Sequence, residues 1–303
     1  MALKDIKAKI GATNRTHKVT RAMEAVSAVK MRKTQLAALS GRPYARAALQ
    51  ILARLSGSAD LLRHPLSAER PTVRTVALVV ITSDKGLAGA LNSSVIRAAA
   101  VALSSRSADA VTVYAYGRKG QEYFARRSYR IARAYENKKD QVDRTVMNEL
   151  SLELSEAFVA GAFDEVLVAY SNFHSTFEQV PVVRRLLPLS LPLLRQLVED
   201  IAPESGKFSQ LHALDAVPAY TVEPSGESVF DALVPRLVAV ALYHMLLESK
   251  ASEHSARMVA MKNASDKSKE VAHDLTRLFN KKRQAAITRE VSEIVGGREA
   301  LAA

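Results

Sequence analysis

The sequence predicts an α/β protein in which a central domain of alternating strands and helices is flanked by two long terminal helices. The run from Arg236 to Val295 contains neither glycine nor proline, and only four such residues interrupt the first 58 positions. Most glycines and prolines lie instead between residues 70 and 226, where strand-like and helical runs alternate. That alternation is typical of a layered domain with a parallel sheet.

The N-terminal zone, residues 1–58, is rich in Ala, Lys, Arg, Met and Leu, which favour helix. We expect one long helix there, bent near "SGRPYA". In the central zone, "RTVALVVIT" (74–82) and "DEVLVAYSNF" (164–173) are rich in β-branched residues and predict buried strands. "AVTVYAYG" (110–117) alternates like a partly covered strand. Helical patterns span about 92–106 and 142–160, and 188–218 is expected to be irregular with a short helix.

The C-terminal helix predicted from about sixty residues has a length of roughly 90 Å, well beyond the diameter of a domain of this size. Such a helix needs a partner along its length, because packing of an apolar stripe supplies most helical stability in water. The N-terminal helix is the obvious partner, although a helix lying over its own domain remains an alternative. The expected apolar stripe of the N-terminal helix is Ile6, Ile10, Val19, Met23 and Val26. The C-terminal stripe comprises Leu242, Met245, Leu246, Val259, Val271, Leu275, Leu278, Ile287, Val291 and Ile294, thinning in between to small residues.

The charge distribution points to an acidic partner. The net charge is +12, and residues 1–40 hold nine Lys/Arg against two acids, while residues 250–298 hold eleven against six. The rest of the chain is balanced. Basic surfaces of this kind bind nucleic acid, anionic lipid or acidic protein surfaces. The chain has no cysteine, which excludes disulfides, thiolate metal sites and cysteine nucleophiles.

Targeting and membrane signals are weak. The N-terminus lacks the apolar stretch of a signal peptide, and runs such as "LVAVALYHMLL" are shorter than a bilayer span. We therefore expect no transmembrane segment.

Six segments together resemble one family. They are "VTRAMEAVSAVKMRKTQ", "RPYA", "SDKGLAGALN", "AYTVEPS", "ASEHSARMVAMKNAS" and "NKKRQAAITREVSEIVGG", in the family's order and spacing from residue 1 to about 297. The chain resembles the gamma subunit of F-type ATP synthase, of bacterial type. The resemblance implies a long antiparallel coiled coil of the N- and C-terminal helices plus a central Rossmann-like α/β domain. The corresponding divisions are 1–60, 70–226 and 230–303.

The resemblance also implies a function. Members form the non-catalytic central-stalk rotor, coupling proton flow through the c-ring to ATP synthesis or hydrolysis in the alpha and beta ring. The implied partners are the alpha, beta and epsilon subunits and the c-ring, without nucleic acid. The chain itself would hold no cofactor, since ATP, ADP and Mg bind to alpha and beta subunits. The implied location is peripheral, on the cytoplasmic face of the bacterial inner membrane.

Contact residues are carried over position by position. Arg283, Gln284 and Thr288 match positions where the shaft's upper end hydrogen-bonds to a beta-subunit loop, and a solvated basic turn is the alternative. Met23 and Lys30 match the part of the N-terminal helix that faces acidic levers of the beta subunits. Met23 could equally belong to the helix seam.

"SDKGLAGALN" invites comparison with a phosphate-binding loop, because a glycine turn between a strand and a helix can point amides at an anion. It lacks the Gly-Lys-Ser/Thr ending, so a structural turn is favoured, with Gly86 and Gly89 shaping it and Asn92 capping the next helix. In the family this loop reaches toward the alpha and beta ring, which makes Asp84 and Lys85 contact candidates.

At the foot of the shaft, Tyr220 and Glu223 match positions near epsilon and the c-ring loops; the alternative is an edge strand ending at Pro224. Neither a metal site nor a catalytic set can be assembled from the sequence. Two rivals remain, a nucleic-acid-binding coiled coil and an α/β enzyme that uses the "SDKGLAG" turn.

Overall fold

The computed structural model describes residues 2–40, 64–138, 142–190 and 226–302. It comprises two compact units, Met1–Ser27 with Arg257–Ala303, and Ala28–Ala256. Both boundaries fall inside the two long helices rather than at their ends. Each unit therefore takes one part of each long helix.

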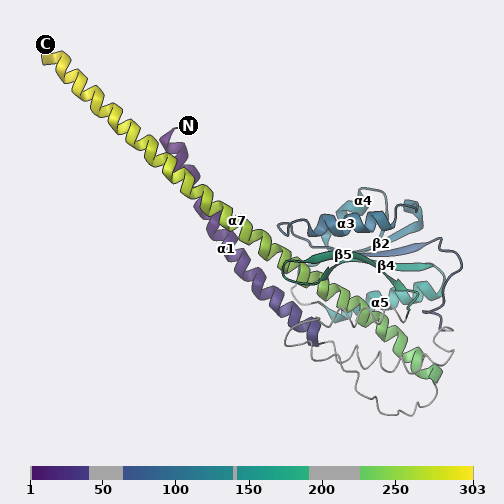
Figure 1. The fold of residues 1–303 in the computed structure, drawn as a ribbon. Helices are drawn as coiled ribbons and strands as arrows, with labels where there is room; N and C mark the ends of the chain where they lie inside the picture. The colour runs from purple at the N-terminus through teal and green to yellow at the C-terminus, as the bar shows by residue number, and fades with distance from the viewer. Residues whose placement is uncertain (1, 41–63, 139–141, 191–225, 303) are drawn as a thin grey trace. The chain divides into compact units, whose positions relative to one another are not determined.

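The second unit is built on a five-stranded sheet (Figure 1). Its strands are β1 (Val76–Ile81), β2 (Val111–Tyr116), β3 (Arg130–Tyr135), β4 (Glu165–Phe173) and β5 (Gln179–Leu187), in the spatial order β3-β2-β1-β4-β5. The first four are mutually parallel and β5 pairs antiparallel with β4. The predicted α/β fold is confirmed, but the sequence analysis missed β3 and β5.

Helices cover both faces of this sheet, which explains why β1 is buried at all six positions. On one face lie α3 (Leu91–Ala102) and α4 (Arg118–Ala125), whose Val95 and Phe124 enter the core. On the other lie α5 (Arg144–Val159) and the first part of α7 (Gly226–Ala302). The β2 strand is more buried than its alternating sequence suggested, because both layers cover it.

The α7 helix begins earlier and ends later than the uninterrupted run predicts. It passes through Pro235, Gly296 and Gly297. Its first part supplies Val234, Leu237 and further residues to the core against the sheet. Packing of this kind stabilises the helix around Pro235.

By length and composition alone, α7 qualifies as a candidate membrane span, with a mean hydropathy of 1.3 in its most apolar window. The expectation that every apolar run is too short to span a bilayer was therefore wrong by the criterion of length and hydropathy. However, 61% of that window is buried inside the protein. Leu242, Met245 and Leu246 face the sheet. The apolarity of this segment is accounted for by the core of the second unit.

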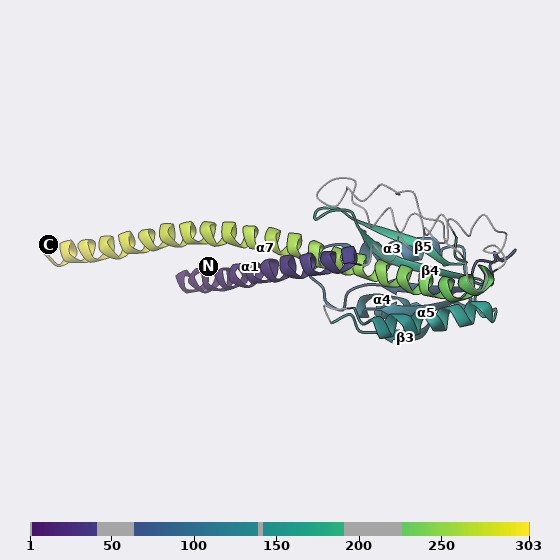
Figure 2. The same ribbon diagram turned by 90° about the horizontal axis from the view of Figure 1, so that it is seen from below.

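In the first unit, the α1 (Leu3–Ser40) and α7 segments lie side by side and run in opposite directions (Figures 1 and 2). The antiparallel coil is thus confirmed. Its buried positions are Ile6, Thr20 and Ser27 on α1 and Met261, Ser265 and Ala272 on α7. Thr20 and Ser27, like Ser265 and Ala272, are seven residues apart, as in a coiled-coil seam.

The predicted stripe on α1 was therefore partly wrong. Ile6 is fully buried, but Val19 and Val26 are 58% and 53% exposed. Each lies one residue before a buried Thr20 or Ser27, so the helix is turned by one position relative to the expected stripe. Small polar side chains let the two backbones approach, and His17 Nδ1 lies 3.0 Å from both the carbonyl oxygen and Oγ of Ser265.

Candidate functional site

The last part of α7 is a helix surface that the described chain does not cover. Every described side chain from residue 273 to 298 is exposed or half-buried. Ile287, Val291 and Ile294 are 51%, 53% and 72% exposed, and their spacing of four and three residues places them on one helix face. An exposed apolar stripe beside basic residues indicates a contact surface for another protein.

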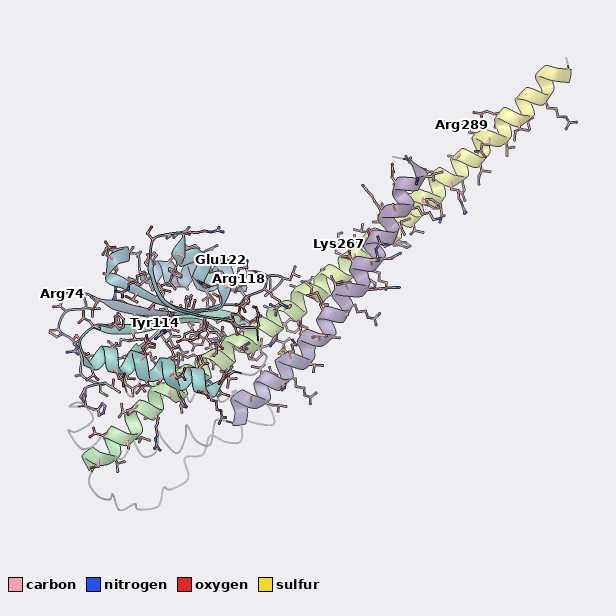
Figure 3. The ribbon with its side chains drawn as sticks, turned by 180° about the vertical axis from the view of Figure 1, so that it is seen from behind. Arg74, Tyr114, Arg118, Glu122, Lys267 and Arg289 are labelled. Carbon is pink, nitrogen blue, oxygen red and sulfur yellow. The ribbon has the colours of Figure 1, made fainter. Side chains whose placement is uncertain are left out.

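Three predicted contact residues lie on this segment. Arg283, Gln284 and Thr288 are all exposed. The Thr288 hydroxyl donates to the Gln284 carbonyl oxygen of its own helix, at 3.0 Å. Figure 3 shows Arg289 on the same segment. The arrangement presents guanidinium and amide donors next to apolar side chains.

The basic residues of α1 are a second set of contact candidates. Arg21 is exposed in the first unit, and Arg32 and Lys33 are exposed in the second. Lys30 and Met23 are half-buried. Intermediate burial fits either role proposed for Met23, so both interpretations stay open.

Asp84, in the loop after β1, is not the surface contact that was predicted. Asp84 is only 6% exposed, and its two carboxylate oxygens accept hydrogen bonds from the backbone N–H groups of Arg118 and Asn137, each at 2.8 Å. Asp84 therefore joins three loops inside the domain and is not a surface contact. The neighbouring Lys85 is exposed and stays a candidate.

Asn92 does not cap α3, contrary to prediction. Its Oδ1 accepts from the backbone N–H of Ser83 at 2.9 Å, which ties the loop to the helix. Gly89 has a φ of +57°, and Leu87 adopts φ of 64° as well. The sequence analysis did not identify Leu87, whose side chain is 61% exposed. A left-handed leucine carries no sequence signal.

The turn between β2 and α4 resembles an anion-binding turn but is already filled. At the start of α4, the N–H groups of Arg118, Lys119 and Gly120 donate to Asp84 Oδ1, the Ser83 carbonyl oxygen and Thr82 Oγ1. Helix N-termini bind anions through such free amides. These three are engaged by the chain itself, which argues against a phosphate site at the start of α4.

An open hollow of about 220 Å³ lies beside this turn, lined in part by Lys85, Arg118 and Lys138. Two of these cations already have acidic partners. Arg118 Nε lies 3.4 Å from Glu122 Oε1, and Lys138 Nζ lies 2.6 Å from Glu136 Oε1. Figure 3 labels Arg118 and Glu122 next to each other. The hollow is electrostatically balanced.

The strongly shifted tyrosines are structural. Burial raises the pKa of Tyr116 to about 12, and burial together with Glu153 raises the pKa of Tyr114 to about 12. Such phenols stay protonated at neutral pH and cannot act as bases. Among the described residues, no group of three His, Asp or Glu side chains could hold a metal ion.

Two predicted residues, Tyr220 and Glu223, lie outside the described residues. The sequence analysis also missed Phe177, which is 82% exposed in the turn between β4 and β5. Its neighbours "HSTFEQ" carry an ordinary turn signal, and nothing in the sequence separates an exposed phenylalanine from a buried one.

Comparison with known proteins gives consistent matches over the whole chain. The family model described as "ATP synthase" matches residues 2–301. The chain is 39% identical over 300 residues to the ATP synthase gamma chain of Pelotomaculum thermopropionicum, covering 99% of both chains. It is 40% identical over 302 residues to the gamma chain of Roseiflexus castenholzii, covering 99% of this chain and 98% of the relative.

Solved structures agree. A chain from the central stalk and c-ring of Tetrahymena thermophila mitochondrial ATP synthase is 27% identical with a TM-score of 0.59, covering 82% of this chain and 99% of that one. A chain of the Euglena gracilis mitochondrial enzyme is 19% identical with a TM-score of 0.63, covering 99% and 94%, and shows the fold.

Proposed function

Because this chain belongs to the ATP synthase gamma-chain family and is a non-catalytic central-stalk subunit of that enzyme, we propose that it is the shaft that couples proton flow to the catalytic ring. The second unit turns with the c-ring and the epsilon subunit. The α7 tip and the basic face of α1 turn inside the ring of alpha and beta subunits. ATP, ADP and Mg bind to those subunits and not to the shaft.

The uncovered tip of α7 is the observation that carries this proposal. An α-helix without tertiary packing is marginal in water, so the segment 273–298 requires a surrounding partner. Its contacts must also permit rotation. Contacts made by isolated exposed charges and scattered apolar side chains give shallow energy minima along the rotation of the helix. A broad apolar interface would instead hold the helix at one rotation angle.

The finer roles are those that the family resemblance implies. Arg283 and Gln284 offer hydrogen-bond donors to a beta-subunit loop, and the Thr288 hydroxyl oxygen can accept one from it. Met23 and Lys30 face acidic levers of the beta subunits. Lys85 at the sheet's loop edge contacts the ring of alpha and beta subunits. Tyr220 and Glu223 approach epsilon and the c-ring. The complex holds the chain at the membrane, and we place it on the cytoplasmic face of the bacterial inner membrane.

Reconstitution tests the proposal. The purified chain is mixed with bacterial alpha and beta subunits, and ATP hydrolysis and rotation of a probe on the second unit are followed. We expect stepwise rotation, and we expect Arg283→Ala with Gln284→Ala to slow hydrolysis. Arg130→Ala, an exposed arginine on the edge strand β3, serves as the matched control and should have no effect.

If the purified chain formed no complex with alpha and beta subunits from a closely related enzyme, the shaft proposal would be refuted. A salt titration of duplex DNA binding would then test the nucleic-acid alternative, for which steep salt dependence is diagnostic.

A further inference from the structure

The side of α7 that faces the sheet changes character along its length. From Val234 to Leu247 it contributes apolar side chains to the core. From Glu248 to Ser255 every residue is buried, yet seven of these eight are polar or charged. Burying so many polar groups is costly unless they are hydrogen-bonded. The sequence alone showed only that the apolar stripe of this helix thins to small residues.

Two serines in this segment bond directly to the sheet. Ser252 Oγ donates to the Ser171 carbonyl oxygen of β4 at 3.0 Å. Ser255 Oγ donates to the Thr176 carbonyl oxygen at 2.6 Å and lies 3.4 Å from Gln179 Nε2. Both serines are 0% exposed. The acceptors belong to the end of β4 and to the turn before β5.

Ser171 lies near the end of β4, opposite a proline. Its register partner in β5 is Pro181, which has no N–H, and the β1–β4 pairing ends at Ala169. A buried carbonyl without a donor is destabilising, and the Ser252 hydroxyl provides a donor to this one. This makes the α7 contact specific to one helix orientation.

Lys250 strengthens the same attachment from another side. Its side chain is 2% exposed, and Nζ donates to the Asn137 carbonyl oxygen at 3.3 Å. Asn137 in turn donates from its backbone N–H to Asp84. The polar segment of α7 is thus joined to β4, to the turn before β5 and to the loop after β3.

Apolar and polar contacts differ in how they resist rotation of a helix. The hydrophobic effect is non-directional, so a helix seated on apolar side chains alone can roll or slide at small cost. Hydrogen bonds weaken steeply away from their preferred distance and angle. Turning α7 by one residue, about 100°, would carry both hydroxyls away from their acceptors.

We propose that Ser252 and Ser255 are positioning residues that lock the rotation of α7 on the sheet. They lie within the last five residues before Ala256, the last residue of the second unit. The inference rests on the proposed function, in which torque enters at this unit and leaves along α7. The lock makes the helix turn with the sheet instead of rolling against it.

The first test measures coupling in the complete ATP synthase, reconstituted into proteoliposomes. The double variant Ser252→Ala and Ser255→Ala is compared with Ser249→Ala, a buried serine on α7 for which the described contacts include no hydroxyl bond to the sheet. Losing one net hydrogen bond shifts an equilibrium by roughly fivefold. We expect protons pumped per ATP hydrolysed to fall at least about twofold in the double variant. The control should match the wild type.

The second test needs only the full chain. Because the chain has no cysteine, Arg185→Cys on β5 and Arg236→Cys on α7, both exposed, accept spin labels without background. The wild type should give one narrow distance between the labels, and the double serine variant a broadened or second distance. If the double variant does not fold, Ser255→Ala alone is measured in both assays.

The outcomes separate the two proposals. Unchanged pumping per ATP together with an unchanged label distance in the serine variants overturns the lock. A changed distance with intact coupling also overturns its role in torque transfer. A wild-type chain that fails to assemble overturns the proposed function, and the label distances then decide whether the serines fix the helix.

Discussion

Replacing Asp84 by alanine should lower the free energy of unfolding of the second unit, although the family resemblance made this residue a candidate for a partner contact. The carboxylate is 6% exposed and accepts two backbone N–H groups at 2.8 Å. A buried donor left without an acceptor costs about 1–3 kcal/mol, so two cost about 2–6 kcal/mol. The open hollow beside the site lets water reach part of the gap. We therefore expect a loss of about 3 kcal/mol, toward the lower half of that range.

The assay is urea denaturation of the purified chain followed by the near-UV circular dichroism of its tyrosines. Tyr116 and Tyr135 stack at 5.9 Å in the same region, and the chain has no tryptophan. Lys85→Ala is the matched control, since this neighbour is exposed and should change the unfolding free energy by less than about 0.5 kcal/mol. An Asp84→Ala chain within about 1 kcal/mol of the wild type, combined with weakened assembly, would refute the internal role.

Three further predictions test other parts of the structure. Gly117→Ala should lower the unfolding free energy by about 4 kcal/mol or more, because φ is +101° and an added Cβ would lie 2.0 Å from the Thr82 carbonyl oxygen. Gly161→Ala, with φ of +77° and open space around it, should lower it by only about 1 kcal/mol in the same denaturation assay. Hydrogen bonds from the backbone N–H groups of Thr75 and Arg74 lower the pKa of Asp164, so its stabilising contribution is present above the unfolded pKa of about 3.9 and is lost as pH falls through the folded pKa. The difference in stability between the wild type and Asp164→Ala should thus shrink from pH 7 to pH 3, and a constant difference would contradict this account. Ile6→Ala should lower the thermal stability of the coil, at a cost of about 2 kcal/mol or more, whereas Val19→Ala should leave its helical circular dichroism melt unchanged.

The strands that the sequence predicted are those whose side chains are buried on both faces. Strand β1 and most of β4 are apolar and β-branched, and burial on two faces requires that composition. The missed strands lie at the two edges of the sheet. Strand β3 is largely exposed and contains Arg130 and Arg133, and β5 contains Pro181. Edge strands tolerate arginine and proline, so their sequences look like loops.

The coil seam could not be found by counting apolar residues. Thr20 and Ser27 are buried while Val19 and Val26 are not. A seam of small side chains allows close approach of backbones, and which side of a weakly amphipathic helix is buried then depends on its partner. The resemblance identified the coil correctly, but it did not specify the seam.

The role of Asp84 depends on residues far away in the sequence. Its two donors lie 34 and 53 positions further along the chain, at the ends of two other strands. The family resemblance made Asp84 a contact candidate because the loop as a whole reaches toward the ring, and it carried no information on which side chains of the loop are buried. Only the sheet order, with β2 between β1 and β3, brings the three loops together.

The turn that leads into α4 explains why an α/β layer suits a rotating part. Glycines at 117 and 120 let the turn pack closely, since an added Cβ at Gly120 would lie 3.0 Å from Val80. In ligand-binding α/β domains such a turn leaves amides free for a phosphate. Here Thr82, Ser83 and Asp84 accept the hydrogen bonds from those amides. A turn that had to change conformation to bind a ligand would deform under torque. The internal hydrogen bonds instead hold this turn to the edge of the sheet. The serines of α7 extend the same principle from the loops to the helix, because directional bonds to backbone carbonyls resist rotation where apolar packing would permit it.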